Sequence, residues 1–395
     1  MDQMDQMDQM DIQGSARKRK RERADKRFKF YGLAALSFAL AFLVFFFVDI
    51  IGKGLPAFQQ AEIQVTVHYN EATMNNYNKA VDKKYKRLVS KTWLRLVPNQ
   101  MRDNPELMGT TRVEWVLAEN RVDQFIKGHE GHRLKSKHQT LVEQMHEEGK
   151  IKLTFNTGFF TKGDSKLPEN AGILASAIGS MLVLLLTMLF AVPIGVMTAI
   201  YLEEFAPDNR LTQIIEVNIN NLAAIPSILY GLLGLAIFIN FMGVPRSSAL
   251  VGGLTLALMT LPVIIIATRA ALRAVPDSIR EAAYGLGASN LQTVWHHVLP
   301  LAMPGILTGS IIGLAQAMGE TAPLLIVGMM AYIPEAPGSI LEATTVLPAQ
   351  IYTWSGESLR AFEERTAAGI MVLLAVLLSL NAAAVKLRNR SENTW

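Results

Sequence analysis

The chain has 395 residues, of which 50% are hydrophobic and 18% charged, and its formal net charge at pH 7 is only +4. This small charge does not indicate a nucleic-acid partner, and the absence of cysteine excludes disulfides, Cys-ligated iron–sulfur clusters and thiol catalysis. Several apolar runs exceed the roughly 20 residues needed to cross the hydrocarbon core of a bilayer. The composition therefore indicates a polytopic membrane protein.

The N-terminal 29 residues are polar and strongly basic. Residues 1–11 repeat a Met-Asp-Gln unit that is too polar to form a packed core, and residues 17–29 are a dense basic run. A basic cluster directly before an apolar segment holds that end of the chain in the cytoplasm. We therefore expect a disordered basic cytoplasmic tail over residues 1–29.

The first apolar run covers residues 30–48. It is longer than the apolar region of a signal peptide, and no A-x-A cleavage site follows it. We therefore predict an uncleaved transmembrane anchor helix over residues 30–49.

The next segment, residues 50–168, is hydrophilic. Apolar and polar residues alternate at 63–67 and 151–155, which predicts strands near both of its ends. Residues 113–126 and 134–148 have the pattern of amphipathic helices. We therefore predict a soluble α+β insert, which lies on the periplasmic side if the first span exits the membrane.

The remaining chain, residues 169–390, contains the other membrane spans. Six crossings in total return the C-terminus to the cytoplasm, and the basic residues Lys386, Arg388 and Arg390 before the tail at 391–395 agree with this orientation. The predicted fold is thus an all-α polytopic membrane protein with an insert between its first two helices. The five further spans are expected near residues 173–201, 221–242, 250–271, 305–333 and 367–385.

The most informative polar segment lies between two of these spans, at residues 278–300. Ser278 with Glu281, and Ser289 with Gln292, have the spacing of capping boxes. Gly287 falls where a left-handed residue would end the first helix, and Pro300 is expected to close the second. The pattern predicts two short helices joined by a glycine turn.

The same segment carries a family resemblance. Glu281, Ala282, Ala283, Gly287, Leu299 and Pro300 match the EAA loop of ABC-importer permeases, although His297 stands where that pattern has an apolar residue. The resemblance implies a cytoplasmic coupling helix that is seated in a cleft of a separate ATPase. The alternative is an interhelical loop in which Glu281 only caps a helix.

Two further stretches narrow the resemblance. Residues 225–232 and 319–325 are similar to phosphate-importer permeases of the PstA type, and the similarity extends from residue 173 to the C-terminus. It implies the permease subunit of an ATP-driven importer of inorganic phosphate in the bacterial inner membrane. The implied partners are a PstC-type permease, two PstB-type ATPases and a periplasmic PstS-type binding protein.

Catalytic motifs are missing from the sequence. No G-x-x-x-x-G-K-[ST] phosphate loop is present, so we expect a non-catalytic subunit that binds no cofactor itself, with ATP-Mg on the partner ATPase. Alternative functions are a permease for another oxyanion such as sulfate or molybdate, a secondary transporter that uses no ATP, and a membrane-anchored sensor.

Glu320 is the main candidate for the translocation pathway. An ionised carboxylate inside a span is costly and usually faces a partner or a cavity, so Glu320 would gate the pathway or bond two helices. Other candidate pathway residues are Gln316, Thr321, Ser227, Tyr230 and Arg269, the last of which could instead extend to the membrane surface. Proline frees a backbone carbonyl and bends a helix, so Pro226 and Pro323 are expected to kink their spans, as are Pro193 and Pro262.

His129 and His132 in the insert have a spacing that could bind a metal together with Glu130 or Glu143. The flanking glycines favour a loop with solvated histidines, and we therefore expect no metal site.

Overall fold

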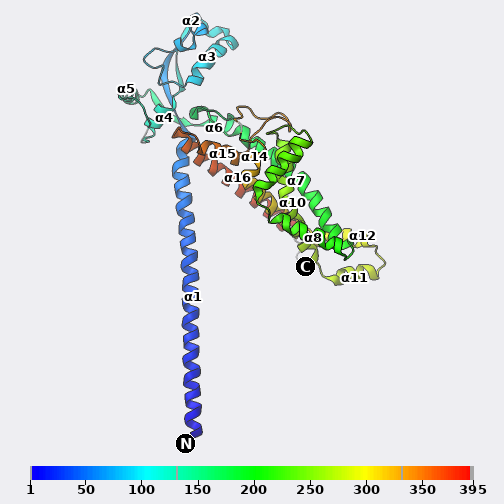
Figure 1. Ribbon diagram of the computed structural model, residues 1–395. Helices are drawn as coiled ribbons and strands as arrows, with labels where there is room; N and C mark the ends of the chain where they lie inside the picture. The colour runs from blue at the N-terminus through cyan, green and yellow to red at the C-terminus, as the bar shows by residue number, and fades with distance from the viewer. Residues whose placement is uncertain (1, 130–131, 331, 392–395) are drawn as a thin grey trace. The chain divides into compact units, whose positions relative to one another are not determined.

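The computed structural model describes residues 2–129, 132–330 and 332–391, and the chain divides into two compact units at Gly52. The first unit contains helix α1, Asp2–Gly54, except for its last two residues (Figure 1). This helix includes residues 2–29, where the sequence predicted disorder; Met, Gln, Lys and Arg are good helix formers, and no proline interrupts them. The apolar part of α1 is long enough to span a bilayer.

The insert of the second unit is built on a three-stranded antiparallel sheet of order β2–β1–β3. Its strands are β1 Gln59–Tyr69, β2 Thr110–Leu117 and β3 Ile151–Phe155. Alternate residues of β1, including Ile63, Val65 and Val67, are buried in the core of the insert. The surrounding helices and turns are η1 Leu55–Phe58, α2 Glu71–Asn75, η2 Tyr77–Lys79, α3 Lys91–Asp103, η3 Pro105–Leu107, α4 Asn120–Ile126, α5 Ser136–Glu147, α6 Thr157–Thr161 and η4 Pro168–Asn170.

The predicted elements of the insert are confirmed except for one. Residues 63–67 and 151–155 lie in strands, and α5 covers most of the helix predicted at 134–148. The helix predicted at 113–126 is wrong, because its first half is strand β2 and α4 begins only at Asn120. The β-branched and aromatic residues of β2 favour a strand, and β2 pairs with one edge of β1.

The membrane part is helical, as predicted. The described residues contain five helices that are long and apolar enough to cross a membrane, or up to six if one bent pair is a single span. Besides α1, the long helices are α7 Leu174–Ile200 with the π-turn η5 Tyr201–Phe205, α10 Ala249–Arg273, α13 Leu299–Gly319 and α16 Ala361–Ser391. The bent pair is α8 Arg210–Ala223 and α9 Ser227–Gly234 with its π-helical end η6 Leu235–Phe241; the shorter helices are α11 Asp277–Gly285, α12 Asn290–Thr293, α14 Ala322–Ile326 and α15 Leu347–Ser355.

Three boundaries differ from the sequence prediction. The span predicted at 221–242 is broken by a bend of 105° between α8 and α9. The span predicted at 305–333 begins at Asn290, because α12, the π-turn η7 Val294–Val298 and α13 form one helix of 30 residues. It ends at Gly319, and Pro300 therefore lies inside a helix instead of closing one. The Leu299 N–H donates to the Val294 carbonyl in the widened turn before Pro300, so the proline enters after a turn that already departs from α-helical bonding.

Small residues bring the central helices together. Cβ atoms added at Gly305 and Gly309 of α13 would collide with Ala271 and Ala267 of α10. Such small-residue contacts allow helix backbones to approach closely in a membrane. Helix α10 also packs along α7, as Figure 1 shows for these two labelled helices.

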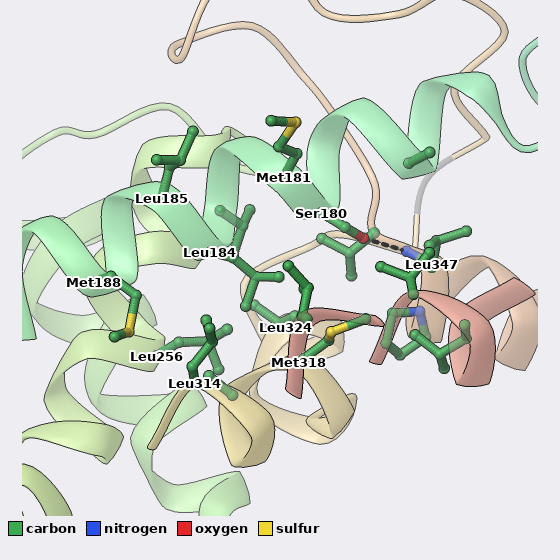
Figure 2. Close-up of a pocket in the computed structure, with 18 residues that line it drawn as sticks. Ser180, Met181, Leu184, Leu185, Met188, Leu256, Leu314, Met318, Leu324 and Leu347 are labelled. Carbon is green, nitrogen blue, oxygen red and sulfur yellow. Dashed lines mark hydrogen bonds between the residues drawn. The ribbon is translucent and has the colours of Figure 1, made fainter. Parts of the chain in front are cut away.

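A cavity of about 450 Å³ lies among α7, α10, α13, α14, α15 and α16 (Figure 2). Its lining is apolar, with Met181, Met188 and Met318 among leucines and valines. The Ser180 hydroxyl accepts a hydrogen bond from the Leu347 N–H at 2.8 Å and is thus already occupied. The lining offers no charged group to an anion, and this cavity is therefore not a polar substrate site.

Candidate functional site

The candidate site is the segment between α10 and α13, residues 277–298, which we call the elbow. Its first helix, α11, begins after Pro276, whose fixed φ suits a helix start. Ser278 therefore lies inside the helix, and the predicted capping box between Ser278 and Glu281 is wrong. The side chain of Glu281 is exposed to solvent.

A glycine turn ends α11 as the sequence predicted. Gly287 has φ +84°, in the left-handed region that side chains disfavour. The Gly287 N–H donates to the Tyr284 carbonyl at 2.9 Å, and the Ala288 N–H donates to the Ala283 carbonyl at 3.1 Å. This is a Schellman motif, which satisfies the last carbonyls of the helix.

The second helix of the elbow starts with a complete capping box. The Ser289 hydroxyl accepts a hydrogen bond from the Gln292 N–H at 3.4 Å, and the Gln292 side chain accepts one from the Ser289 N–H at 2.9 Å. From there the helix continues through η7 into α13. Any rotation of the second elbow helix is thus transmitted directly to a membrane span.

Arg280 fixes α11 to the ends of two long helices. Its guanidinium donates hydrogen bonds to the carbonyls of Leu272 and Val275, at 3.0 and 2.8 Å. The guanidinium thereby caps the C-terminal end of α10. It also forms a two-pronged ion pair with Glu204 of η5, at 2.7 and 3.3 Å. Both charged side chains are largely buried, and the two parallel hydrogen bonds fix the orientation of the Arg280 guanidinium relative to Glu204.

Arg269 belongs to a neighbouring ion-pair network. Its Nε lies 3.1 Å from Glu203 Oε2 and its Nη2 lies 2.6 Å from Glu216 Oε1, with 11% of the side chain exposed. Glu203 also pairs with Arg273 at 2.6 Å. The structure thus places Arg269 in contacts between α10, η5 and α8, where its charge is paired with two carboxylates.

The outer face of the elbow is apolar and uncovered. Leu286 is 90% exposed, Leu291 64% and Trp295 61%, whereas Ala283 is buried. Ala282 and His297 are exposed as well. An exposed aromatic and aliphatic patch of this kind marks an interaction site.

The two proline-containing stretches meet inside the membrane part. A Cβ added at Gly231 would lie 2.7 Å from Cα of Pro323, so α9 and α14 touch at backbone distance. Pro226 lies at the 105° bend and Pro323 in the first turn of α14, whereas Pro193 and Pro262 lie inside continuous helices. Hence two of the four prolines coincide with helix breaks.

Tyr230 has a role that the sequence did not indicate. Its hydroxyl donates to the Leu222 carbonyl at 2.7 Å, which is the carbonyl that Pro226 leaves without its helical donor. Tyr230 is therefore engaged in closing the helix break and offers no free donor to a substrate.

The other candidate pathway residues lie near the break between α13 and α14. Glu320 follows the last residue of α13 with extended backbone, so it is not inside a helix as predicted. Glu320, Thr321 and Ser227 are half-buried and Gln316 is exposed. Within residues 2–129, 132–330 and 332–391, no hydrogen bond involves any of these four side chains.

The family model for "Binding-protein-dependent transport system inner membrane component" matches residues 191–391, just over half of the chain. The chain belongs to this family. It is a multi-pass inner-membrane permease, and the elbow lies within the matched region. A second family model, "Domain of unknown function (DUF3333)", matches residues 15–98 of the permease.

Named relatives agree with this family. "Phosphate transport system permease protein PstA 1" of Mycobacterium tuberculosis is 33% identical over 225 residues, or 56% of this chain and 73% of that protein. "Probable ABC transporter permease protein YqgI" of Bacillus subtilis is 36% identical over 42% of this chain and 56% of that protein, so the match spans about half of that relative's length. The resemblance to PstA-type permeases is thereby confirmed. Among solved structures, a chain of the MetNI methionine ABC transporter is 20% identical, with a TM-score of 0.43 over 54% of this chain and 95% of that one.

The two histidines that the sequence suggested as metal ligands, His129 and His132, make separate protein contacts. His129 Nε2 lies 2.9 Å from Glu364 Oε1, outside hydrogen-bond geometry, and His132 Nδ1 accepts from the Leu134 N–H at 3.0 Å. Among the described side chains no group of three potential ligands gathers, and the suggested ligand Glu130 lies outside the described residues.

Sequence reasoning missed the acidic partners of the elbow. Glu203 and Glu204 follow the apolar run of α7, and they hold Arg269, Arg273 and Arg280. A signal was present, because two adjacent carboxylates at one end of a span face a basic cluster at the end of another. Only the fold shows which carboxylate meets which arginine.

Proposed function

We propose that the chain is the membrane-spanning subunit of an ATP-driven importer of inorganic phosphate. Its partners would be a second permease of the PstC type, two PstB-type ATPases that bind ATP-Mg, and a periplasmic PstS-type binding protein. Family membership and the relatives named as phosphate transport permeases support this assignment. The chain would perform no catalysis itself.

The exposed apolar face of the elbow is the observation that carries the proposal. Leu286, Leu291 and Trp295 would enter a cleft of the ATPase, while Glu281 would meet its polar rim. Because Arg280 fixes α11 to α10 and η5, a displacement of the elbow would move several membrane helices together. Closure of the ATPase dimer would thereby switch the permease between outward and inward access.

The anion pathway would be shared with the partner permease. The cavity within this subunit is apolar, so it offers no route to phosphate. Glu320, Thr321, Gln316 and Ser227, whose side chains make no hydrogen bonds within the described residues, would face that route near the contact of α9 with α14. Glu320, as an anion, would orient a cation of the partner rather than touch phosphate.

Gly287 offers a direct test of coupling. Valine at this position is strained, because a β-branched residue avoids φ near +84°, although space for its side chain is available. We expect Gly287→Val to abolish uptake of labelled phosphate in cells that carry all four partners, with normal membrane insertion. The matched control is Gly285→Ala, a helical glycine with equally open surroundings, which should import normally. Normal ATP-driven uptake by Gly287→Val would refute the coupling role.

The absence of cysteine makes the orientation testable. In the variant Glu281→Cys the introduced thiol is unique, and we expect a membrane-impermeant maleimide to label it only after the cells are opened. Labelling in intact cells would contradict the proposed location of both chain ends and the elbow in the cytoplasm.

Substrate choice is tested by a separate competition experiment. We expect that unlabelled sulfate or molybdate does not compete with the uptake of labelled phosphate.

A further inference from the structure

The insert carries a dense basic surface that the transport role does not use. Residues 79–95 contain seven lysines and arginines and a single acidic residue. Val81, Leu88, Val89 and Leu94 of this segment are buried in the core of the insert. The intervening Lys83, Lys84, Arg87, Lys91 and Arg95 are therefore exposed.

A second basic segment faces the same surface from the start of α5. Two adjoining hollows, of about 480 and 970 Å³, share Lys86, Arg87, Lys135 and His138 in their linings. We call the larger hollow the basic groove and define it by its cations, which are Lys83, Lys84, Lys86, Arg87, Lys135 and Lys137.

No carboxylate of the described residues lies at ion-pair distance from the cations of the basic groove, although Glu148 interacts with Lys84 over a longer range. In the described part of the chain none of the six cations forms an ion pair, unlike the arginines around the elbow. The carboxylate of the adjoining hollow, Glu119, already pairs with Arg121 at 3.6 Å. Six like charges in a concave surface repel one another and focus a positive potential, which concentrates anions there.

The lining indicates the class of anion. Six of the ten described lining residues of the basic groove are lysines or arginines. The described linings of the two hollows contain no Phe or Trp and only Tyr77 and His138 as aromatic rings, whereas nucleic-acid sites stack successive bases on several aromatic side chains. Lysine binds phosphate oxygens as a mobile point charge rather than through a fixed fork. A single phosphate ion would occupy a small part of the groove, whereas a chain of linked phosphates would meet cations along its length.

We propose that the basic groove binds a linear, soluble polyphosphate chain. A bilayer presents its headgroups as a plane, which a concave surface contacts poorly, so membrane lipid is the less suitable source of the same phosphate chemistry. Capture of such a chain outside the cell rests on the proposed topology, and it would hold a phosphate store beside the importer. The binding itself requires neither ATPase nor transport.

The test uses the full-length permease in a neutral detergent and an end-labelled short polyphosphate, with fluorescence anisotropy as the readout. We expect binding that weakens steeply with salt, as for other multi-phosphate ligands. The exposed triple variant Lys83→Gln, Lys84→Gln, Arg87→Gln should lower the salt slope by about 2, at about 0.7 per lost phosphate contact, and weaken binding about tenfold or more.

A matched control removes three cations elsewhere on the insert, in the variant Arg102→Gln, Arg112→Gln, Lys166→Gln. Equal loss in the control, or salt-independent binding, would refute the groove. Anionic phospholipid vesicles that bind in place of polyphosphate would also overturn the proposal. The groove variant should still import single phosphate ions normally. If the parent protein itself fails to import phosphate, that result contradicts the proposed transport function, whereas the polyphosphate-binding proposal is decided by the anisotropy measurement alone.

Discussion

At the scale of single residues, Tyr230 shows how the broken span is held together. Its hydroxyl supplies the Leu222 carbonyl with the donor that Pro226 lacks. Removing the hydroxyl would leave the Leu222 carbonyl with only the Ile225 N–H, at 3.1 Å, and the loss of one hydrogen bond costs about 0.5–1.5 kcal/mol. We expect Tyr230→Phe to lower the thermal midpoint of the detergent-solubilised permease. The control Tyr352→Phe removes an exposed hydroxyl without such a bond and should leave the midpoint unchanged.

Glu169 predicts a pH dependence of stability. Burial, together with the nearby Glu119 carboxylate, raises the pKa of Glu169 to about 7, although its own backbone N–H, the Ser90 hydroxyl at 3.3 Å and the charge of Arg365 oppose the rise. The folded protein then binds a proton that the unfolded chain releases near pH 4.5. The free energy of unfolding should therefore fall as the pH rises from about 4.5 to about 7, by on the order of 3 kcal/mol, and level off above.

The variant Glu169→Gln removes this titration. We expect it to flatten the dependence of the thermal midpoint on pH and to be more stable than the parent at pH 8. Glu106→Gln, at an exposed glutamate of the insert, is the control and should keep the parent profile. A parent midpoint that is constant between pH 5 and 8 would contradict the assignment.

Residue-level prediction from sequence succeeded for two features set by local bonding, although the equally local capping box of Ser278 did not form. Gly287 and the capping box of Ser289 follow from contacts within a few residues, and the structure has both. The contacts of Arg269 could not be predicted, because its carboxylate partners, Glu203 and Glu216, lie 66 and 53 residues away in sequence. No local pattern contains that information.

At the scale of elements, Arg280 contacts two carboxylates that we expect to contribute differently to the free energy of unfolding. Glu204 is buried and pairs with two atoms of the guanidinium, whereas Asp277 is 90% exposed and lies 3.3 Å away. We expect Glu204→Gln to cost about 1–3 kcal/mol and Asp277→Asn less than about 1. Hydrogen exchange of amides 277–293 should accelerate in the first variant alone, and phosphate uptake should fall with it.

Element boundaries in the membrane part were only partly predictable. Apolar runs located the long helices, because length and hydropathy suffice for this. They did not reveal that α12, η7 and α13 are one helix, since Pro300 normally predicts an end and a π-turn has no clear sequence pattern. The same limit applies to strand β2, whose pairing with β1 outweighed a helical pattern.

At the scale of the second unit, the insert is joined to α16 through buried charges. Glu364 of α16 accepts hydrogen bonds from Gln124 at 2.6 Å and Lys127 at 3.3 Å, both on or next to α4. Arg365 donates to the Ala57 carbonyl at 3.0 Å. These partners are more than 200 residues apart in sequence, which explains why the sequence predicted two separate parts and no joint.

This joint can be weakened selectively. We expect Glu364→Gln to cost about 1–3 kcal/mol, because Lys127 keeps only Asp123 as its charged partner, at 2.7 Å. Amides of α4 and β1 should then exchange faster, while those of α10 should not. Glu363→Gln next to it is the control, since Glu363 is exposed and its contact with Arg360 is 3.9 Å long.

The contacts of Arg280 also limit which amino acids are tolerated at position 280. One planar guanidinium serves the carboxylate of Glu204 and the carbonyls of Leu272 and Val275 at once. A lysine at this position would carry the same charge but has no fork to reach all three. Substitution would therefore require a compensating change in η5, so the two positions should vary together among descendants of this chain.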